Sequence, residues 1–197
     1  MSPDPAPPTR VVIAEDEAII RLDLKELLQE EGYDVVGETG RGDEAIELVR
    51  DLRPDLVILD IKMPGLDGLS AARTVASERL AAVLMVTAFS QRELVEQARD
   101  AGALAYLVKP FQKSDLIPAI EVALGRFAEL TALERDVEDL QSRLEARKTI
   151  DRAKGRLMDD HGLAEQDAWR FLQQQAMANR VKVDEIARRV VDGELTP

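Results

Sequence analysis

Short apolar runs alternate with amphipathic segments through the first 125 residues. The apolar runs are four or five residues long and fall at 11–14, 34–37, 56–60, 82–86 and 104–107. Between them, apolar residues recur every three or four positions, at 17–31, 42–52, 67–77, 90–101 and from 113 onward. Short continuous runs are typical of strands buried on both faces, and the longer spacing is typical of helices. Five such strand–helix units predict an α/β fold with a doubly wound parallel sheet.

The helical pattern that begins near residue 113 continues far beyond the length of one strand–helix unit. From Asp115 to about Asp159 only Gly125 and Gly155 weaken it, so one long helix is predicted, with Ser114 as its expected N-cap. Part of this helix carries apolar residues at spacings of four, three and four, the repeat of a coiled coil, at Leu133, Val137, Leu140 and Leu144. This stripe either packs on its own domain or forms a dimer or docking surface, and we favour the second interpretation.

A compact helical module is predicted over residues 145–191. Its first helix is the end of the long helix, which stops at His161-Gly162 because glycine is a natural C-terminal stop. A second helix is expected at about 165–178 and a third at about 184–191. Three helices of this size bury little surface, so we expect the long helix or a partner to complete the core.

Composition excludes several classes of site. The 197 residues contain no cysteine, which excludes a disulfide framework and a zinc–thiolate site, and the single His161 excludes a multi-histidine metal site. The first ten residues contain four prolines and no apolar signal region, and no apolar run approaches the ~20 residues of a membrane span. We therefore expect a soluble, cytoplasmic protein of one or two domains, with a disordered N-terminus over residues 1–8.

Charge is distributed unevenly along the chain, whose formal net charge is −12. Residues 1–125 hold 13 basic and 23 acidic side chains, whereas residues 126–197 hold 13 and 15. Within the second part, residues 143–156 hold six basic and two acidic side chains. The overall charge argues against non-specific nucleic-acid binding, but this basic segment leaves specific binding open.

Chemically active residues stand at the ends of the predicted strands. Glu15 and Asp16 follow the first run, and Asp60 closes the third just before Met63-Pro64-Gly65. Open α/β sheets bind ligands beyond the carboxyl ends of their strands, and clustered carboxylates suit a hard cation. The fourth and fifth runs add Thr87, Tyr106 and Lys109-Pro110. Each residue alone has an ordinary interpretation, as a helix cap, a core side chain or a surface lysine, but the ordered set indicates a site.

This set resembles the receiver domain of two-component response regulators over residues 9–125. The resemblance implies a flavodoxin-like strand order of 2-1-3-4-5 and a phosphoacceptor at Asp60, which takes its phosphoryl group from a sensor histidine kinase. It also implies Mg²⁺ held by Glu15, Asp16, Asp60 and the backbone carbonyl of Lys62. Lys109, on a cis peptide bond with Pro110, and Thr87 would contact the phosphoryl group, and Tyr106 would move with Thr87 as a switch.

The tail resembles the ANTAR domain, an RNA-binding output of transcription antitermination regulators, over about 135–191. The resemblance is carried by Ala153-Lys154-Gly155-Arg156-Leu157-Met158, Ala168-Trp169-Arg170-Phe171-Leu172, Asn179-Arg180 and Ile186-Ala187. It implies binding to RNA hairpins near terminators, usually by dimers, with candidate contacts at Lys154, Arg156, Arg170, Arg180 and Lys182. Trp169 either stacks on a base or lies in the core, and we favour the core.

The expected organisation is therefore a receiver domain at 9–125, a coiled-coil linker helix at 126–144, an ANTAR domain at 145–191 and a tail at 192–197. The expected function is phosphorylation-dependent antitermination. No Ser/His/Asp or Cys/His set is present, so we expect no enzyme beyond self-phosphotransfer and autodephosphorylation. Two alternatives remain open: a DNA-binding transcription regulator, and an adaptor whose helical tail binds a protein.

Overall fold

The computed structural model describes residues 7–197, so the expected disordered N-terminus at residues 1–8 lies mostly outside the described residues. The chain divides into two compact units, the first ending at Thr131 and the second beginning at Ala132. One helix, α5 (Lys113–His161), contributes residues to both units, as the uninterrupted helical pattern predicts.

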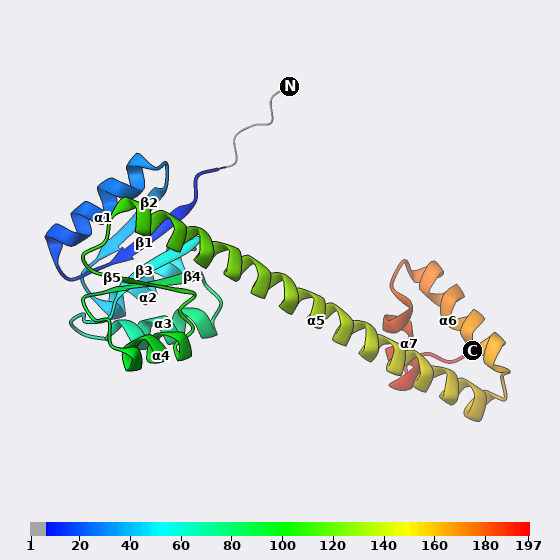
Figure 1. Cartoon of the computed structure of the whole chain (residues 1–197). Helices are drawn as coiled ribbons and strands as arrows, with labels where there is room; N and C mark the ends of the chain where they lie inside the picture. Colours follow the sequence, from blue (N-terminus) through cyan, green and yellow to red (C-terminus); the bar gives the residue numbers. More distant parts are fainter. Residues whose placement is uncertain (1–6) are drawn as a thin grey trace, which may run out of the picture. The chain divides into compact units, whose positions relative to one another are not determined.

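The first unit is built on a five-stranded parallel sheet (Figure 1). The strands are β1 (Arg10–Ala14), β2 (Asp34–Thr39), β3 (Leu56–Asp60), β4 (Ala82–Thr87) and β5 (Ala105–Val108). Their order is β2-β1-β3-β4-β5, which confirms the predicted order. The register pairs Ala14 with Leu59 and Asp60 with Val86, so the central strands end at one common edge.

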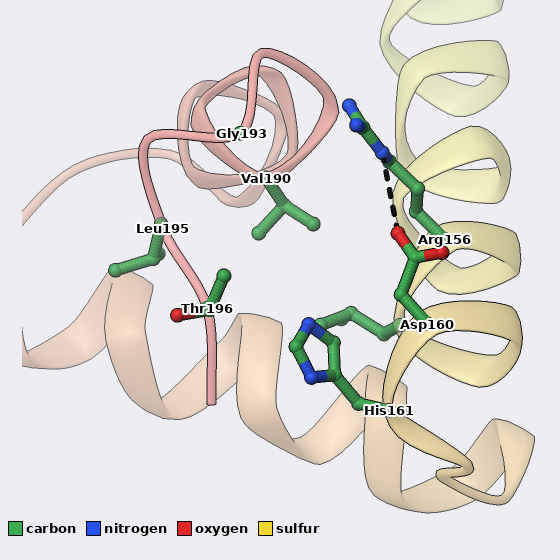
Figure 2. Close-up of a pocket in the computed structure, with 8 residues that line it drawn as sticks. Arg156, Asp160, His161, Val190, Gly193, Leu195 and Thr196 are labelled. Atoms are coloured by element: carbon green, nitrogen blue, oxygen red, sulfur yellow. Dashed lines mark ion pairs between the residues drawn. The ribbon is translucent and has the colours of Figure 1, made fainter.

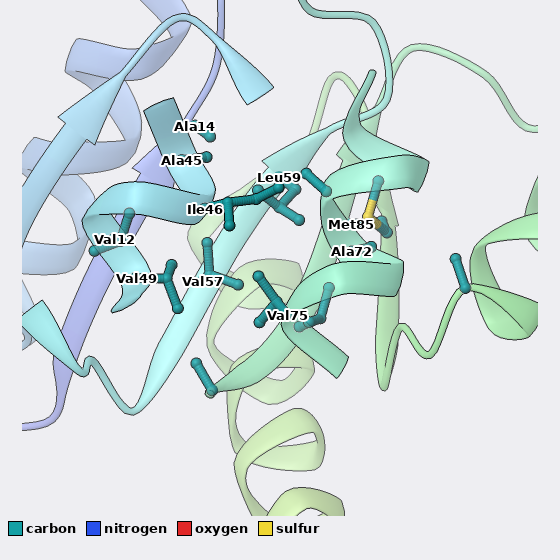
Figure 3. Close-up of a cluster of buried hydrophobic side chains, with 14 of the residues drawn as sticks. Val12, Ala14, Ala45, Ile46, Val49, Val57, Leu59, Ala72, Val75 and Met85 are labelled. Atoms are coloured by element: carbon teal, nitrogen blue, oxygen red, sulfur yellow. The ribbon is translucent and has the colours of Figure 1, made fainter. Parts of the chain in front are cut away.

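Helices cover both faces of this sheet because the strand residues that point to either face are apolar. One face packs on α2 (Gly42–Leu52), α3 (Gly68–Ser77) and α4 (Arg92–Asp100), through a cluster that includes Val12, Val57 and Met85 (Figure 3). The other face packs on α1 (Ala18–Glu30) and on the start of α5. Its hydrophobic cluster combines residues of these two helices with residues of the strands that they cover. These two clusters fix the strand ends, and with them any site at the sheet edge.

The start of α5 differs from the prediction of a Ser114 cap. The helix begins at Lys113, so Ser114 lies inside it. Gln112 occupies the capping position: its carbonyl accepts from the Leu116 amide at 3.1 Å, and its amide donates to the Asp115 carboxylate at 3.0 Å. An acid at the third helical position can satisfy the capping amide, and this contact replaced the serine cap expected from propensity.

The second unit is a three-helix module made by the end of α5, α6 (Glu165–Asn179) and α7 (Val183–Val191). The bounds of α6 and α7 agree with the predicted segments to within one residue. Gly162, whose φ angle is +66°, follows the end of α5, as the glycine stop predicts. The buried core combines Ala153 and Leu157 of α5 with residues of α6 and α7, so the long helix does complete the module.

Close packing at two glycines positions the loop after β3. A Cβ atom on Gly68 would lie 1.8 Å from the carbonyl oxygen of Asp60, and one on Gly42 would lie 2.1 Å from the carbonyl oxygen of Leu66. The Gly68 amide also donates to the Ile61 carbonyl at 2.9 Å. The loop that leaves Asp60 therefore folds back against the end of its own strand, at a distance that only glycine permits.

We expect Gly68→Ala to destabilise the first unit by about 2–3 kcal/mol, because backbone must move to accept the added methyl group. Gly125→Ala is the matched control, since a Cβ atom at Gly125 meets nothing within 4 Å and the residue lies inside a helix. That change should be neutral or stabilise the helix by up to about 1 kcal/mol. Urea unfolding followed by circular dichroism measures both. Equal midpoints for the two variants would contradict the close approach.

Candidate functional site

Three carboxylates meet at the carboxyl edge of the sheet. Glu15 and Asp16 directly follow β1, and Asp60 is the last residue of the neighbouring β3. Each of the three offers an oxygen atom, and these atoms all lie within 4.8 Å of one another. The site is assembled by strand order, because adjacent parallel strands that end together deliver residues about 45 positions apart to one place.

The cluster is mostly withdrawn from water. Glu15 is 1% exposed and Asp60 6% exposed, whereas Asp16 is exposed. Burial raises the pKa of the Glu15 carboxyl and of the Asp60 carboxyl, and the neighbouring Lys109 ammonium offsets only part of that rise. The Asp60 carboxylate keeps one backbone partner, the Ile61 amide, which donates to Oδ1 at 2.8 Å.

Lys109 supplies the positive charge of the site. Its Nζ atom lies 2.5 Å from Glu15 Oε2 and 3.6 Å from Asp60 Oδ2, and its side chain is 9% exposed. The Lys109–Pro110 peptide bond is cis, as the resemblance implied. The Lys109 amide donates to the Thr87 carbonyl at 2.8 Å, so β4 holds the lysine in place.

The donor set fits a hard divalent cation. Three carboxylates face one ammonium group, which leaves the cluster with excess negative charge. Glu15 Oε2 is buried, and the partner described for it is the Lys109 ammonium. Oxygen donors with uncompensated charge are the ligands that Mg²⁺ and Ca²⁺ prefer.

Thr87 and Tyr106 are linked through a residue that sequence reasoning did not identify, Phe89. The fully buried Thr87 accepts a hydrogen bond at its hydroxyl from the Phe89 amide at 3.3 Å. The Tyr106 hydroxyl donates to the Phe89 carbonyl at 2.5 Å. Burial raises the pKa of the Tyr106 hydroxyl, which keeps it a donor at neutral pH. The two expected switch residues thus share Phe89 as a hydrogen-bond partner.

Lys62 joins the same loop system through its side chain. Its ammonium lies 4.3 Å from the centre of the Phe89 ring, a cation–π contact. Lys62 and Asp16 also line one open hollow of about 540 Å³ beside the acidic cluster. No motif links Lys62 to Phe89, since the two residues are 27 positions apart and meet only because β3 and β4 are neighbours.

The candidate RNA-binding residues of the second unit fall into two groups: those held by contacts between helices of the chain, and those that stay exposed. The Lys154 ammonium lies 2.9 Å from Glu165 and 3.0 Å from Asp151, and its side chain is only 20% exposed. These carboxylates raise the pKa of Lys154, the hydrogen bond to Glu165 most. Lys154 therefore ties α5 to the start of α6, and its charge is already compensated within the chain.

Arg156 is engaged on the other side of α5. Its guanidinium donates to the Val191 carbonyl at the end of α7 and lies 3.5 Å from the Asp160 carboxylate (Figure 2). Arg156, Asp160, His161 and Leu195 line a cavity of about 70 Å³. A guanidinium that satisfies a helix C-terminus is a structural contact, so Arg156 is a weaker candidate for RNA than its sequence motif indicated.

The other three candidate RNA contacts are exposed on the surface of the second unit. Arg170 pairs with Asp167 at 3.0 Å, but its side chain stays 63% exposed. Arg180 ends α6 in a left-handed conformation with φ of +55°, and Lys182 precedes α7. Both are exposed. The candidates that can reach a ligand therefore belong to α6 and the turn that follows it.

Trp169 corrects the prediction of a core residue. It is 38% exposed and lies outside the hydrophobic core of the second unit, which takes Ala168 and Leu172 from the same helix. The prediction was wrong because Trp169 lies at the border of the buried line formed by Ala168, Leu172 and Ala176, where its side chain is only partly covered. Apolar neighbours in the sequence did not predict burial of the Trp169 side chain.

The coiled-coil stripe is also exposed. Leu133, Val137, Leu140 and Leu144 are 65%, 47%, 64% and 54% exposed. This exposure favours the interpretation of the stripe as a dimer or docking surface. An exposed apolar stripe of this regularity is typical of a helix that pairs with another helix in a coiled coil.

Comparisons with known proteins identify both units. A model of the response regulator receiver domain matches residues 11–121, and a model of the ANTAR domain matches residues 138–191. The transcriptional regulatory protein PdtaR of Mycobacterium tuberculosis is 57% identical over 194 residues, which cover 98% of this chain and 95% of that protein. The chemotaxis protein CheY of Thermotoga maritima is 38% identical over 112 residues, 56% of this chain and 93% of that protein.

Solved structures agree with the fold of the first unit. A CheY-like receiver domain protein from Methanospirillum hungatei matches with a TM-score of 0.57 at 27% identity, over 62% of this chain and 98% of that chain. CheY of Borrelia burgdorferi, solved in a complex with CheX, BeF₃ and Mg²⁺, matches with a TM-score of 0.55 at 26% identity, over 57% and 87% of the two chains. Within residues 7–197, no helix combines the length and the apolar character that crossing a membrane requires. The chain belongs to the two-component response regulators that join a receiver domain to an ANTAR domain.

Proposed function

We propose that this protein accepts a phosphoryl group on Asp60 from a sensor histidine kinase and then regulates transcription termination by binding RNA hairpins. The observation that carries the proposal is the meeting of Asp60 with Glu15, Asp16 and Lys109 at a sheet edge, in a chain that ends in an ANTAR domain. The proposal divides the chain into the receiver at 9–125, the linker helix at 126–144 and the RNA-binding domain at 145–191. With a sensor kinase and nascent RNA as its partners, the protein would act in the cytoplasm.

The chemistry is transfer from nitrogen to oxygen. An Asp60 carboxylate oxygen attacks the phosphorus of phosphohistidine, the phosphorus–nitrogen bond breaks, and the imidazole leaves with the bonding electron pair and takes up a proton. Lys109, already 3.6 Å from Asp60, neutralises charge on the phosphoryl oxygens. Glu15, Asp16, Asp60 and the Lys62 carbonyl would hold Mg²⁺, which supplies further neutralisation. The BeF₃ and Mg²⁺ in the Borrelia burgdorferi CheY structure support this assignment.

A groove beside Lys109 suits the kinase as phosphoryl donor. Ile20 and Leu27 of α1 and Phe111 line it, and its volume is about 340 Å³. Ile19 and Leu22 on the same helix are 77% and 54% exposed. An exposed apolar surface next to the phosphoacceptor provides a docking place for the protein that carries the phosphohistidine.

Phosphorylation would act on the output through Thr87 and Tyr106. A phosphoryl group on Asp60 offers the Thr87 hydroxyl a charged acceptor, and the loop that carries Phe89 then loses its present partner. Tyr106, bonded to the Phe89 carbonyl, moves with that loop. The equilibrium between two arrangements of this face would then favour dimerisation through the stripe at Leu133, Val137, Leu140 and Leu144.

RNA is a better-supported partner than duplex DNA. The helix that would enter a major groove, α7, has nine residues and carries Asp184 and Glu185 in its first turn, where they repel phosphates. Dimerisation doubles the basic contacts made by Arg170, Arg180 and Lys182, which strengthens binding when phosphorylation brings two copies together.

Asp60→Asn should abolish labelling by phosphoramidate, a small donor with the same phosphorus–nitrogen bond as phosphohistidine. The amide has nearly the same shape and keeps the hydrogen bond from Ile61, but it is no nucleophile. Asp51→Asn, at an exposed carboxylate of α2, should be labelled like the unmodified chain, and removal of Mg²⁺ with a chelator should bring labelling to background. Mass spectrometry reads the result, and retained label in Asp60→Asn would refute the assignment.

Without Mg²⁺, Asp60→Asn should raise the melting temperature at pH 7 by a few degrees, corresponding to about 1 kcal/mol. Burial raises the pKa of Asp60 above its ordinary 3.8, so the ionised carboxylate destabilises the fold. The destabilisation by Asp60 is absent below the ordinary pKa and grows as the pH rises through the raised pKa of the folded state. The advantage of the variant should therefore shrink as the pH falls toward 4, and Mg²⁺ should stabilise the unmodified chain more than the variant.

Leu140→Asp should prevent the dimer formed with BeF₃⁻ and Mg²⁺, because a coiled-coil seam cannot bury an unpaired carboxylate at acceptable cost. Ser142→Asp adds the same charge at an exposed position two residues away, outside the stripe, and should dimerise normally. Light scattering distinguishes the 21.8 kDa chain from its dimer. A Leu140→Asp chain that dimerises as readily as Ser142→Asp would exclude the stripe as the interface.

A further inference from the structure

The outer face of α6 has an unusual composition for a surface helix. We use the name for side chains of α6 outside the buried line of Ala168, Leu172 and Ala176, with Trp169 at the border of that line: Gln166, Trp169, Arg170, Gln173, Gln174 and Met177. Three are amides, one is the only tryptophan of the chain, and Met177 is 78% exposed. The single acid at the edge of this face, Asp167, is paired with Arg170 at 3.0 Å.

We propose that the outer face of α6 is the surface on which unpaired bases of an RNA loop are bound, with Trp169 as the stacking platform. The inference rests on the proposed RNA-binding function and deepens it. It assigns base recognition to α6 and excludes Lys154 and Arg156 from direct contact, although the sequence motif around them carried the family resemblance.

The side-chain types match nucleobases better than phosphates. An indole offers a π-face to any unstacked base, and each such stack is a substantial part of single-strand affinity. Glutamine amides carry a donor and an acceptor, which suits the edges of unpaired bases. Arg170 can stack or donate, and its side chain is 63% exposed despite the pair with Asp167.

Phosphate contacts are available at one end of this face. Arg180 closes α6 and Lys182 follows two residues later, and no ion pair engages either side chain among the contacts described for residues 7–197. By contrast, Lys154 and Arg156 already satisfy groups of their own chain. Positive charge that no described ion pair engages is thus available next to the aromatic and amide face, where it complements an RNA backbone.

The dimensions favour a nucleic acid over a second copy of the chain. Trp169 and Met177 are eight residues apart, about 12 Å along a helix, which is the length of roughly three to four stacked nucleotides. These two are the exposed large apolar residues of α6 within the described chain. Two apolar side chains separated by glutamines are too few for the apolar centre of a stable protein interface.

The single tryptophan provides a direct test, because the intrinsic tryptophan fluorescence of the full chain comes from this face alone. A hairpin RNA with an unpaired loop is titrated into the phosphoryl-mimic form with BeF₃⁻ and Mg²⁺. The same stem closed as a blunt duplex is titrated in parallel. We expect the loop hairpin to quench Trp169 saturably and the duplex to leave the emission unchanged, since paired bases cannot stack on a side chain.

Variants separate stacking from charge. Trp169→Ala should weaken hairpin binding by at least about fivefold, and Trp169→Phe should restore most of the affinity because it keeps an aromatic face. Arg170→Gln should weaken binding, whereas Arg188→Gln should not. These two arginines are matched: each pairs with an aspartate on its own helix, and their side chains are 63% and 65% exposed. Affinity is measured by electrophoretic mobility shift, which does not depend on the tryptophan.

The outcomes distinguish this inference from the proposed function. If the unmodified chain binds no hairpin RNA, the proposed function itself fails. If the chain binds RNA but Trp169→Ala and Arg170→Gln bind as tightly as Arg188→Gln, RNA binding stands and the α6 face is excluded. Emission that changes with protein concentration in the absence of RNA would assign the face to a second copy and overturn the inference.

Discussion

Crowding of negative charge at the carboxyl edge of the sheet is the constraint on which the receiver depends. Glu15, Asp16 and Asp60 face one ammonium group in a pocket from which water is largely withdrawn, and burial raises the pKa of two of these carboxyls. Such a site costs folding free energy, so it persists only where other interactions determine the geometry. Two hydrophobic clusters on opposite faces of the sheet fix the strand register, and Gly68 lets the loop after Asp60 return to within contact of the strand.

The same charge imbalance connects the site to its switch. A cation and a phosphoryl group would give Lys109 and Thr87 new partners, and Thr87 is already bonded to the Phe89 amide. Phe89 also accepts from Tyr106 and carries Lys62 over its ring, so one residue links β4, β5 and the loop after β3. Local rearrangement at the pocket therefore has a defined path to the face that carries Tyr106. The path consists of hydrogen bonds and one cation–π contact.

The second unit follows a different principle. Its core is small, and ion pairs and helix-end contacts supplement it: Lys154 holds the start of α6, and Arg156 holds the end of α7. Residues whose charges are used in this way are poor ligands for RNA. What the module leaves unpartnered is the stripe on α5 and the outer face of α6, and these surfaces suit the two partners of the proposed function, a second copy and RNA.

The strand order was implied by the resemblance to the receiver domain, whereas the sequence by itself determined the strands, the helices and the set of residues at the sheet edge. These features follow from local periodicity and from the rule that parallel strands end together, so Asp60, Thr87 and Lys109 were found as a set. Tertiary structure alone decided which polar groups are already satisfied. Phe89 links the switch residues, Lys154 and Arg156 are tied to their own chain, and Trp169 is partly exposed. The physical reason is that the availability of a charge or an aromatic ring depends on partners distant in sequence, and hydrophobic periodicity contains no information about those partners.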